Sequence, residues 1–216
     1  MRSGAAGASP FTEHTMRALI AAALLCATQA HATGDCISPD EVELARLVNE
    51  YRTQNGLAAL PVSRWLSATA QWHIWDRINN PSAVGGACNP HSWSNNPPPG
   101  ITWQGMCYTS DHAQAQAMWA KPRQISVNRY TGNGYELAAD SGGTQTPAQA
   151  LAQWQGSPAH NTVILQQGAW AGINLRGLGT GMLGTVAVLW FGDAQDTDVA
   201  MLPCPTDAIY TNGFEG

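Results

Sequence analysis

Hydrophobic residues recur with a helical period in the first third of the chain. The stretch SPDE (38–41) combines a serine suited to an N-cap, a proline at the first helical position and a glutamate that completes a capping box. The apolar residues that follow fall at i, i+3, i+4 and i+7: Leu44, Leu47, Val48 and Tyr51. Gly56 suits the position just past a helix end. The pattern therefore predicts a helix from residue 39 that ends before Gly56.

A second helical pattern starts near Ser63 and ends at Pro81. Its large apolar residues repeat at i, i+3, i+7 and i+10: Trp65, Ala68, Trp72 and Trp75. We expect this tryptophan stripe to pack between the helix and a sheet. His73 lies inside the stripe, next to Trp72, and this position favours a structural role for it.

The middle of the chain is less regular. Residues 80–110 are rich in Pro, Gly and Asn, which favours loops. After them we expect a helix over Asp111–Trp119 and a strand over Gln124–Tyr130. His112 falls in the first turn of this helix, where a side chain is usually exposed. A second capping box, TPAQ (146–149), predicts a helix that reaches Trp154.

The C-terminal third changes to the period of a strand. Ala171, Ile173 and Leu175 alternate with other residues, and Thr185–Phe191 is apolar on both faces. The intervening GLGTGMLG (177–184) suits a hairpin connection. A strand that is apolar on both faces needs cover on both sides. Helices before and after a small antiparallel sheet predict an α+β fold, a three-layer α-β-α sandwich.

Composition narrows the classes of function. The 216 residues suffice for one domain with a real core. Only 12% of the residues are charged, and the net charge is −5. The chain lacks the basic surface that nucleic acids or anionic lipid headgroups require, so we expect no nucleic-acid partner.

The N-terminal segment has the features of a secretory signal. The apolar run ALIAAALLCA (18–27) follows Arg17 and is too short to cross a membrane. The stretch AHA (30–32) is a small-x-small cleavage site. We predict that residues 1–32 form an extension and signal peptide, cleaved after Ala32. The mature protein is then secreted, extracellular or periplasmic, without a transmembrane segment. It has one domain over residues 36–204 and a C-terminal tail over residues 205–216.

Four cysteines remain after this cleavage. An even number in an exported chain predicts two disulfides, although one pair could stay reduced. Four cysteines allow three connectivities. We favour Cys88–Cys107, which closes a loop of moderate length, and Cys36–Cys204, which joins the two ends of the domain.

Two histidines and a glutamate are the strongest candidates for a site. His91 lies in CNPHSW (88–93), and His160 lies in GSPAHNTVIL (156–165) at the start of a short helix. Loops and helix starts on a rigid scaffold often carry binding groups. Glu136 is the only acid between Asp111 and Asp140, and a partly buried carboxylate needs a partner. The alternative for Glu136 is an exposed position at a helix start.

Several motifs follow one another in an order that is typical of one family. They are LVNEYRTQNGLAALPVSRWLSATAQWHIWD (47–76), the loop with His91, GYEL (134–137), WQGSPAHNTVIL (154–165), AGINL (171–175) and VLWFG (188–192). Over roughly residues 40–195 the chain resembles the CAP superfamily. This family comprises cysteine-rich secretory proteins, antigen 5, pathogenesis-related 1 proteins and bacterial SCP domains. GYEL stands for the family's G-E-N with one residue inserted and Leu137 in place of asparagine.

The resemblance implies a CAP/SCP-like domain with a central cleft between two histidines and up to two acids. In some members this cleft binds a divalent metal such as zinc. The matching positions here are His91, His160 and Glu136. Where relatives carry a second acid, this chain reads WQGS (154–157), without one. The gap between His91 and Glu136 contains an insertion, residues 97–130, that could roof or reshape the cleft.

Three functions fit these residues. A secreted binding module would take a lipid, peptide or wall component, with weak Zn2+ binding by His91, His160 and Glu136. A zinc-dependent hydrolase or protease would use Glu136 as general base, but catalytic zinc also needs three protein ligands, and no second acid is visible. An interaction protein would leave the cleft unused. Ser92 and Ser157 lie outside any nucleophile-elbow motif, which disfavours a serine nucleophile. The sequence favours the binding module over an enzyme.

Overall fold

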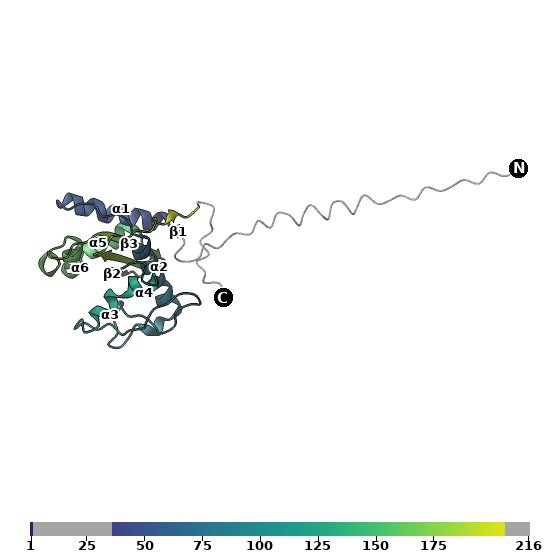
Figure 1. The fold of residues 1–216 in the computed structure, drawn as a ribbon, viewed down its shortest axis with the longest axis horizontal. Helices are drawn as coiled ribbons and strands as arrows, with labels where there is room; N and C mark the ends of the chain where they lie inside the picture. The colour runs from purple at the N-terminus through teal and green to yellow at the C-terminus, as the bar shows by residue number, and fades with distance from the viewer. Residues whose placement is uncertain (2–35, 206–216) are drawn as a thin grey trace.

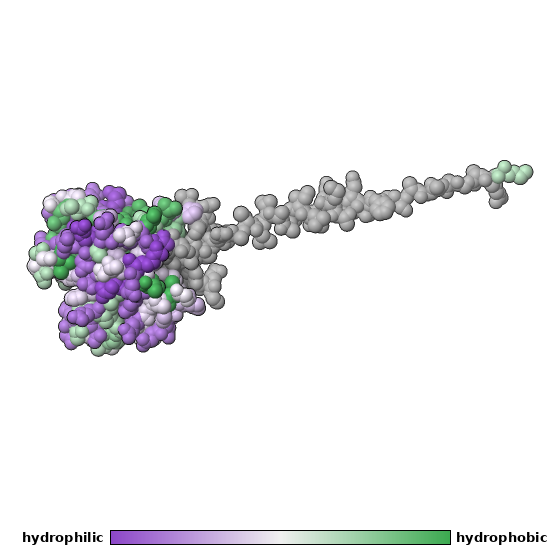
Figure 2. Space-filling view, viewed as in Figure 1, coloured by the Kyte–Doolittle hydropathy of each residue, from purple (hydrophilic) through white to green (hydrophobic). Residues whose placement is uncertain are grey.

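The computed structural model describes Met1 and residues 36–205 (Figure 1). The predicted signal peptide, its cleavage site after Ala32 and residues 206–216 of the tail lie outside the described residues. Within the described range, no helix is both long and apolar enough to span a membrane. The face shown in Figure 2 is mostly hydrophilic, with hydrophobic residues in smaller groups.

Three antiparallel strands form the central sheet in the order β2-β4-β3. They are β2 (Gly134–Asp140), β3 (Gly177–Leu183) and β4 (Val186–Gly192). The middle strand β4 is buried along its whole length. Its residues alternate between two cores, with Leu189 and Phe191 in one and Val188 and Trp190 in the other. The predicted strand that is apolar on both faces is therefore confirmed, shifted by one residue.

Helices cover both faces of this sheet (Figure 1). The core with Leu189 takes residues of α1 (Pro39–Gln54), α5 (Pro147–Gly156) and α6 (Pro158–Ile164). The core with Trp190 takes residues of α2 (Arg64–Asn79), α3 (Ala115–Trp119) and α4 (Lys121–Ile125). Two short 3-10 helices, η1 (Pro81–Ala83) and η2 (Gly168–Trp170), lie in the connections. The predicted α+β sandwich of three layers is confirmed.

Local signals place the helix starts where the sequence predicts them. Ser38 and Glu41 form the capping box of α1, and Thr146 and Gln149 form that of α5. Glu41 also has a tertiary role, because its carboxylate accepts hydrogen bonds from Gln71 Nε2 of α2 and from the N–H of Met182 in β3. Burial raises the pKa of Glu41 above its ordinary value.

Helix α2 lies unusually close to β3. A Cβ at Gly179 would clash with the backbone of Leu66 and Ser67, and one at Gly181 would press on Ala70. The glycines of β3 therefore allow the backbone of α2 to approach the sheet. The tryptophans of the predicted stripe are only half-buried, and Trp75 meets Trp103 of the following loop edge-on at 6.2 Å between ring centroids.

Three predicted elements differ in the structure. Residues 171–175 are not a strand, whereas GLGTGML (177–183), predicted as a turn, is β3. Its glycines allow the approach of α2, and the actual turn falls at Gly184, which has a φ of +58°. The predicted strand 124–130 is also wrong, because α4 occupies residues up to Ile125 and a turn follows. The helix predicted from Asp111 begins only at Ala115.

Both favoured disulfides are present. Cys36–Cys204 joins β1 (Cys36–Ile37) to β5 (Leu202–Pro203), which pair in parallel, and so links the two ends of the domain. Cys88–Cys107 ties the loop before His91 to the segment that precedes α3.

Candidate functional site

Glu136 is the centre of a buried charged cluster. It lies in β2 with 7% of its surface exposed, and each carboxylate oxygen meets an imidazole. Oε1 accepts a hydrogen bond of 2.7 Å from His91 Nδ1. Oε2 lies 2.6 Å from Nδ1 of His73 in α2, within the distance of an ion pair. The Nδ1–H bond does not point at this oxygen, so the contact is not a hydrogen bond. The prediction of a buried, partnered Glu136 is confirmed, and His73 is a partner that the sequence did not indicate.

The contacts of His73 hold its ring in one orientation. Its Nε2 lies 3.0 Å from the carbonyl oxygen of Ser92, which can only accept a hydrogen bond. Its Nδ1 faces the Glu136 carboxylate. Its ring stacks on Trp93 at 4.3 Å, which fixes the ring plane.

The two imidazoles control the ionisation of Glu136. Burial by itself would raise the pKa of this carboxyl, because a low-dielectric interior disfavours the charge. The contact with His73 at 2.6 Å and the hydrogen bond from His91 favour the ionised carboxylate, outweigh burial and lower the pKa of Glu136 to about 2. The carboxylate is therefore ionised at neutral pH.

His91 is the member of the cluster that reaches solvent, with 19% of its side chain exposed. Its Nδ1–H donates to Glu136, so Nε2 holds the free lone pair when the ring is neutral. The loop around it is firmly held. The His91 N–H donates to Asn89 Oδ1, and the Asn89 N–H donates to the carbonyl of Tyr108, next to the Cys88–Cys107 disulfide. The Tyr108 ring meets the His91 ring edge-on at 5.5 Å.

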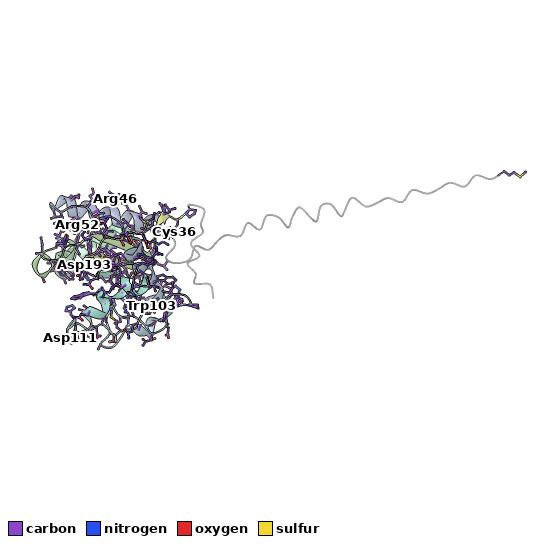
Figure 3. All side chains as sticks on the ribbon, in the orientation of Figure 1. Cys36, Arg46, Arg52, Trp103, Asp111 and Asp193 are labelled. Atoms are coloured by element: carbon purple, nitrogen blue, oxygen red, sulfur yellow. A yellow bond between two sulfur atoms is a disulfide. The ribbon has the colours of Figure 1, made fainter. Side chains whose placement is uncertain are left out.

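His160 approaches from α6 and is partly buried. Burial lowers its pKa, and the charge that His91 carries when protonated lowers it further, so the neutral ring of His160 is favoured. Helix α1 holds α6 in place. Tyr51 donates a hydrogen bond of 2.9 Å to Asn161 Oδ1, and Arg52, labelled in Figure 3, donates one of 2.7 Å to the carbonyl of Ile164. Ser157 occupies the predicted N-cap position, but its side chain makes no capping hydrogen bond.

The cluster bears on the predicted metal ligands. Among the residues that the structure describes, no three His, Cys, Asp or Glu side chains are grouped so as to hold a metal ion. Both oxygens of Glu136 face imidazoles, so a His₂Glu ligand set does not fit this arrangement. The groups left for a metal are the imidazoles of His91 and His160.

Two other residues considered from the sequence, His112 and Ser92, do not contact Glu136 through their side chains. His112 is exposed, and its Nδ1 is hydrogen-bonded to the Tyr108 hydroxyl at 3.1 Å. Ser92 supports the cluster through its carbonyl, while its hydroxyl accepts the N–H of Tyr108. The only signal for His73 in the sequence is its place next to Trp72 in the tryptophan stripe of α2, and a satisfied core histidine gives the same signal.

Comparisons with known proteins give matches by structure alone, because neither models of protein families nor the curated proteins match the sequence. A cysteine-rich secretory protein from Staphylococcus aureus matches with 13% identity and a TM-score of 0.45, over 72% of this chain and 39% of that one. An extracellular protein containing a SCP domain from Bacillus anthracis matches with 16% identity and a TM-score of 0.48, over 72% and 40%. An outer surface protein from Borrelia burgdorferi matches with 16% identity and a TM-score of 0.46, over 72% and 93%. The chain thus spans about two fifths of the length of the first two proteins.

Proposed function

We propose that the chain is a secreted CAP/SCP-type module that binds its ligand through the imidazoles of His91 and His160. The hydrogen bond of 2.7 Å from His91 Nδ1 to Glu136 carries this proposal. It fixes the tautomer of His91 and leaves Nε2 free to accept a hydrogen bond or to bind a metal ion. His73 holds the second oxygen of Glu136, so the carboxylate acts as an orienting group for His91.

A divalent ion such as Zn2+ would be held weakly. When bound it would supply a Lewis acid that attracts a carboxylate, phosphate or carbonyl group of a lipid, peptide or wall component. Two imidazoles form a smaller ligand set than the three or four protein ligands of stable zinc sites. His91 and His160 would provide these two ligands. Glu136 would raise the basicity of the His91 ring through its hydrogen bond to Nδ1.

A zinc-dependent hydrolase or protease is the weaker candidate. That function needs a carboxylate free to take a proton from a bound water. Glu136 is ionised, but its two oxygens are engaged by His73 and His91, which leaves neither one aimed at a substrate. The geometry supports binding better than turnover.

Zinc titration of the mature, oxidised protein by calorimetry tests the proposal. We expect one weak site, lost in His91→Ala and in His160→Ala and unchanged in His112→Ala, the matched control for an exposed histidine. Glu136→Gln keeps the shape of the side chain and should weaken binding by about 10- to 100-fold, the usual effect of losing an orienting carboxylate. Absence of binding at about 1 mM zinc, or equal binding in all the variants, would contradict a metal role for the two imidazoles.

A further inference from the structure

A second candidate site lies in the segment that the proposed function does not use. The residues between Asn95 and Asn128 enclose an open groove of about 530 Å³, built from the loop before α3, from α4 and from the turn that follows it. The groove shares no residue with the His91 cluster. Its lining consists of one indole, one guanidinium, one exposed valine and five uncharged polar side chains: Asn95, Thr102, Trp103, Gln104, Arg123, Gln124, Val127 and Asn128.

The aromatic part of the groove is rigid. Trp103 Nε1 donates a hydrogen bond of 2.9 Å to the carbonyl of Ser94. Its ring meets Trp93 edge-on at 5.2 Å and Trp75 at 6.2 Å. Figure 3 places Trp103 on the side of α3 and α4, well away from Arg52 on α1. A ring held in this way is organised before any ligand arrives, which lowers the entropy lost on binding.

Hydrogen bonds among the lining residues and from Lys121 also fix the walls of the groove. Gln124 Oε1 accepts the N–H of Gln104 at 2.9 Å, and the Gln124 carbonyl accepts the Thr102 hydroxyl at 3.1 Å. The buried ammonium of Lys121 donates to the carbonyl of Gln104. By contrast, across residues 36–205 no hydrogen bond engages the exposed side-chain amides of Asn95, Gln104 and Asn128. Fixed walls therefore present free amide groups to solvent.

The rim of the groove carries a strained turn. Val127 and Asn128 have φ values of +50° and +64°, and a β-branched residue in this left-handed region is a genuine outlier. The turn is held by hydrogen bonds from the Val127 N–H to the Gln124 carbonyl and from the Asn128 N–H to the Arg123 carbonyl. It leaves Val127 71% exposed beside a free amide. Strain of this kind concentrates where a site must be kept in a fixed shape for a ligand.

We propose that this groove binds an uncharged oligosaccharide. Sugar hydroxyls both donate and accept hydrogen bonds, as the side-chain amides of Asn and Gln do. Trp103 is buried, with 8% of its surface exposed, so it offers little area to a ligand, and the C–H faces of a sugar ring can pack mainly on the exposed Val127. The lining holds no carboxylate and one guanidinium, which suits a ligand without a dense charge. An extended peptide would need a free strand edge or a row of side-chain pockets, and the groove is lined by loop, helix and turn.

Binding of soluble oligosaccharides to the mature, oxidised protein tests this proposal. The probes are cellohexaose, chitohexaose, maltohexaose and xylohexaose, and the readout is the shift of the Asn and Gln side-chain amide signals in 15N-labelled protein. We expect at least one probe to bind with a Kd of about 1 mM or below and to shift the signals of Asn95, Gln104 and Asn128.

Two variants make the test specific. Asn128→Gly removes the amide and keeps the left-handed backbone, and combining it with Gln104→Ala should weaken binding at least tenfold. Gln155→Ala changes an exposed amide on α5 and should bind like the unchanged protein. No binding of any probe, or unchanged binding in the double variant, would overturn the proposal, as would capture of unstructured polar peptides in its place. Zinc binding should be the same in all these variants, so failure of this groove is distinguishable from failure of the His91 site.

Discussion

At the residue scale, the cluster depends on one carboxylate shared by two imidazoles. The side chains of Glu136 and His73 are both fully buried. Pairs of this kind are sensitive to the loss of one member, because the remaining charge is left buried without its partner. His73 therefore supports the geometry of His91 indirectly, through its contact with Glu136.

Replacement of His73 by Leu should destabilise the fold by about 3–5 kcal/mol, because it leaves Glu136 Oε2 buried without a cation. The double variant His73→Leu, Glu136→Leu should be less destabilised than His73→Leu alone, since it removes both charges. Urea unfolding at neutral pH measures the free energies of unfolding. His112→Leu is the control at an exposed histidine, and a loss for His73→Leu no larger than for this control would contradict the ion pair.

The lowered pKa of Glu136 predicts how stability changes with pH. The folded state holds this carboxyl ionised down to about pH 2, whereas the unfolded chain protonates it near its ordinary value of 4.5. Its contribution to stability is therefore present above pH 4.5 and is lost as the pH falls towards 2.

Comparison of the protein with its Glu136→Gln variant isolates this effect. The difference in free energy of unfolding should be largest at pH 6 and shrink through this window, measured by urea unfolding at several pH values. The buried Glu41, whose raised pKa acts in the opposite direction, contributes equally to both proteins and cancels. A difference that stays constant from pH 6 to pH 3 would show that Glu136 is not held ionised.

At the scale of elements, the sequence predicts what depends on local signals and misses what depends on tertiary contacts. The capping boxes at Ser38 and Thr146 predict two helix starts, because a cap acts within four residues. The glycines of β3 mislead, since they serve the approach of α2 and not a turn. Likewise His91, Glu136 and His160 stand out as rare polar groups, while His73 is concealed by the tryptophans around it in the sequence.

The contact between α2 and β3 gives a prediction at this scale. Gly179→Ala places a methyl group against the backbone of Leu66 and Ser67, so the helix must shift. We expect a loss of about 1–3 kcal/mol or more in thermal unfolding, the range for overpacked cores. Gly172→Ala is the matched control, because a Cβ there meets nothing within 4 Å. Equal melting temperatures for the two variants would mean that α2 can move away from the sheet at little cost.

At the scale of the whole molecule, the two disulfides constrain the chain to different extents. Cys36–Cys204 spans 168 residues and Cys88–Cys107 spans 19. In the chain-entropy account, closing the longer loop removes more freedom from the unfolded chain, about 5 kcal/mol against about 3 kcal/mol. The longer bridge lies at the edge of the fold beside the exposed strand β5, whereas the shorter one supports the loop of His91.

The two disulfides should therefore differ in effect: the longer one mainly stabilises the fold, and the shorter one mainly fixes the geometry around His91. Replacing Cys36 and Cys204 by serine should lower the free energy of unfolding more than replacing Cys88 and Cys107, and should leave the imidazole signals of His91 unchanged in NMR spectra. Removing the shorter bridge should alter those signals, because the Asn89 and Tyr108 contacts that hold His91 lie beside it. If the shorter bridge proved the more stabilising, loop entropy would not be the main effect of the disulfides. The pairing of β1 with β5 would then have to hold the two ends of the domain together without Cys36–Cys204.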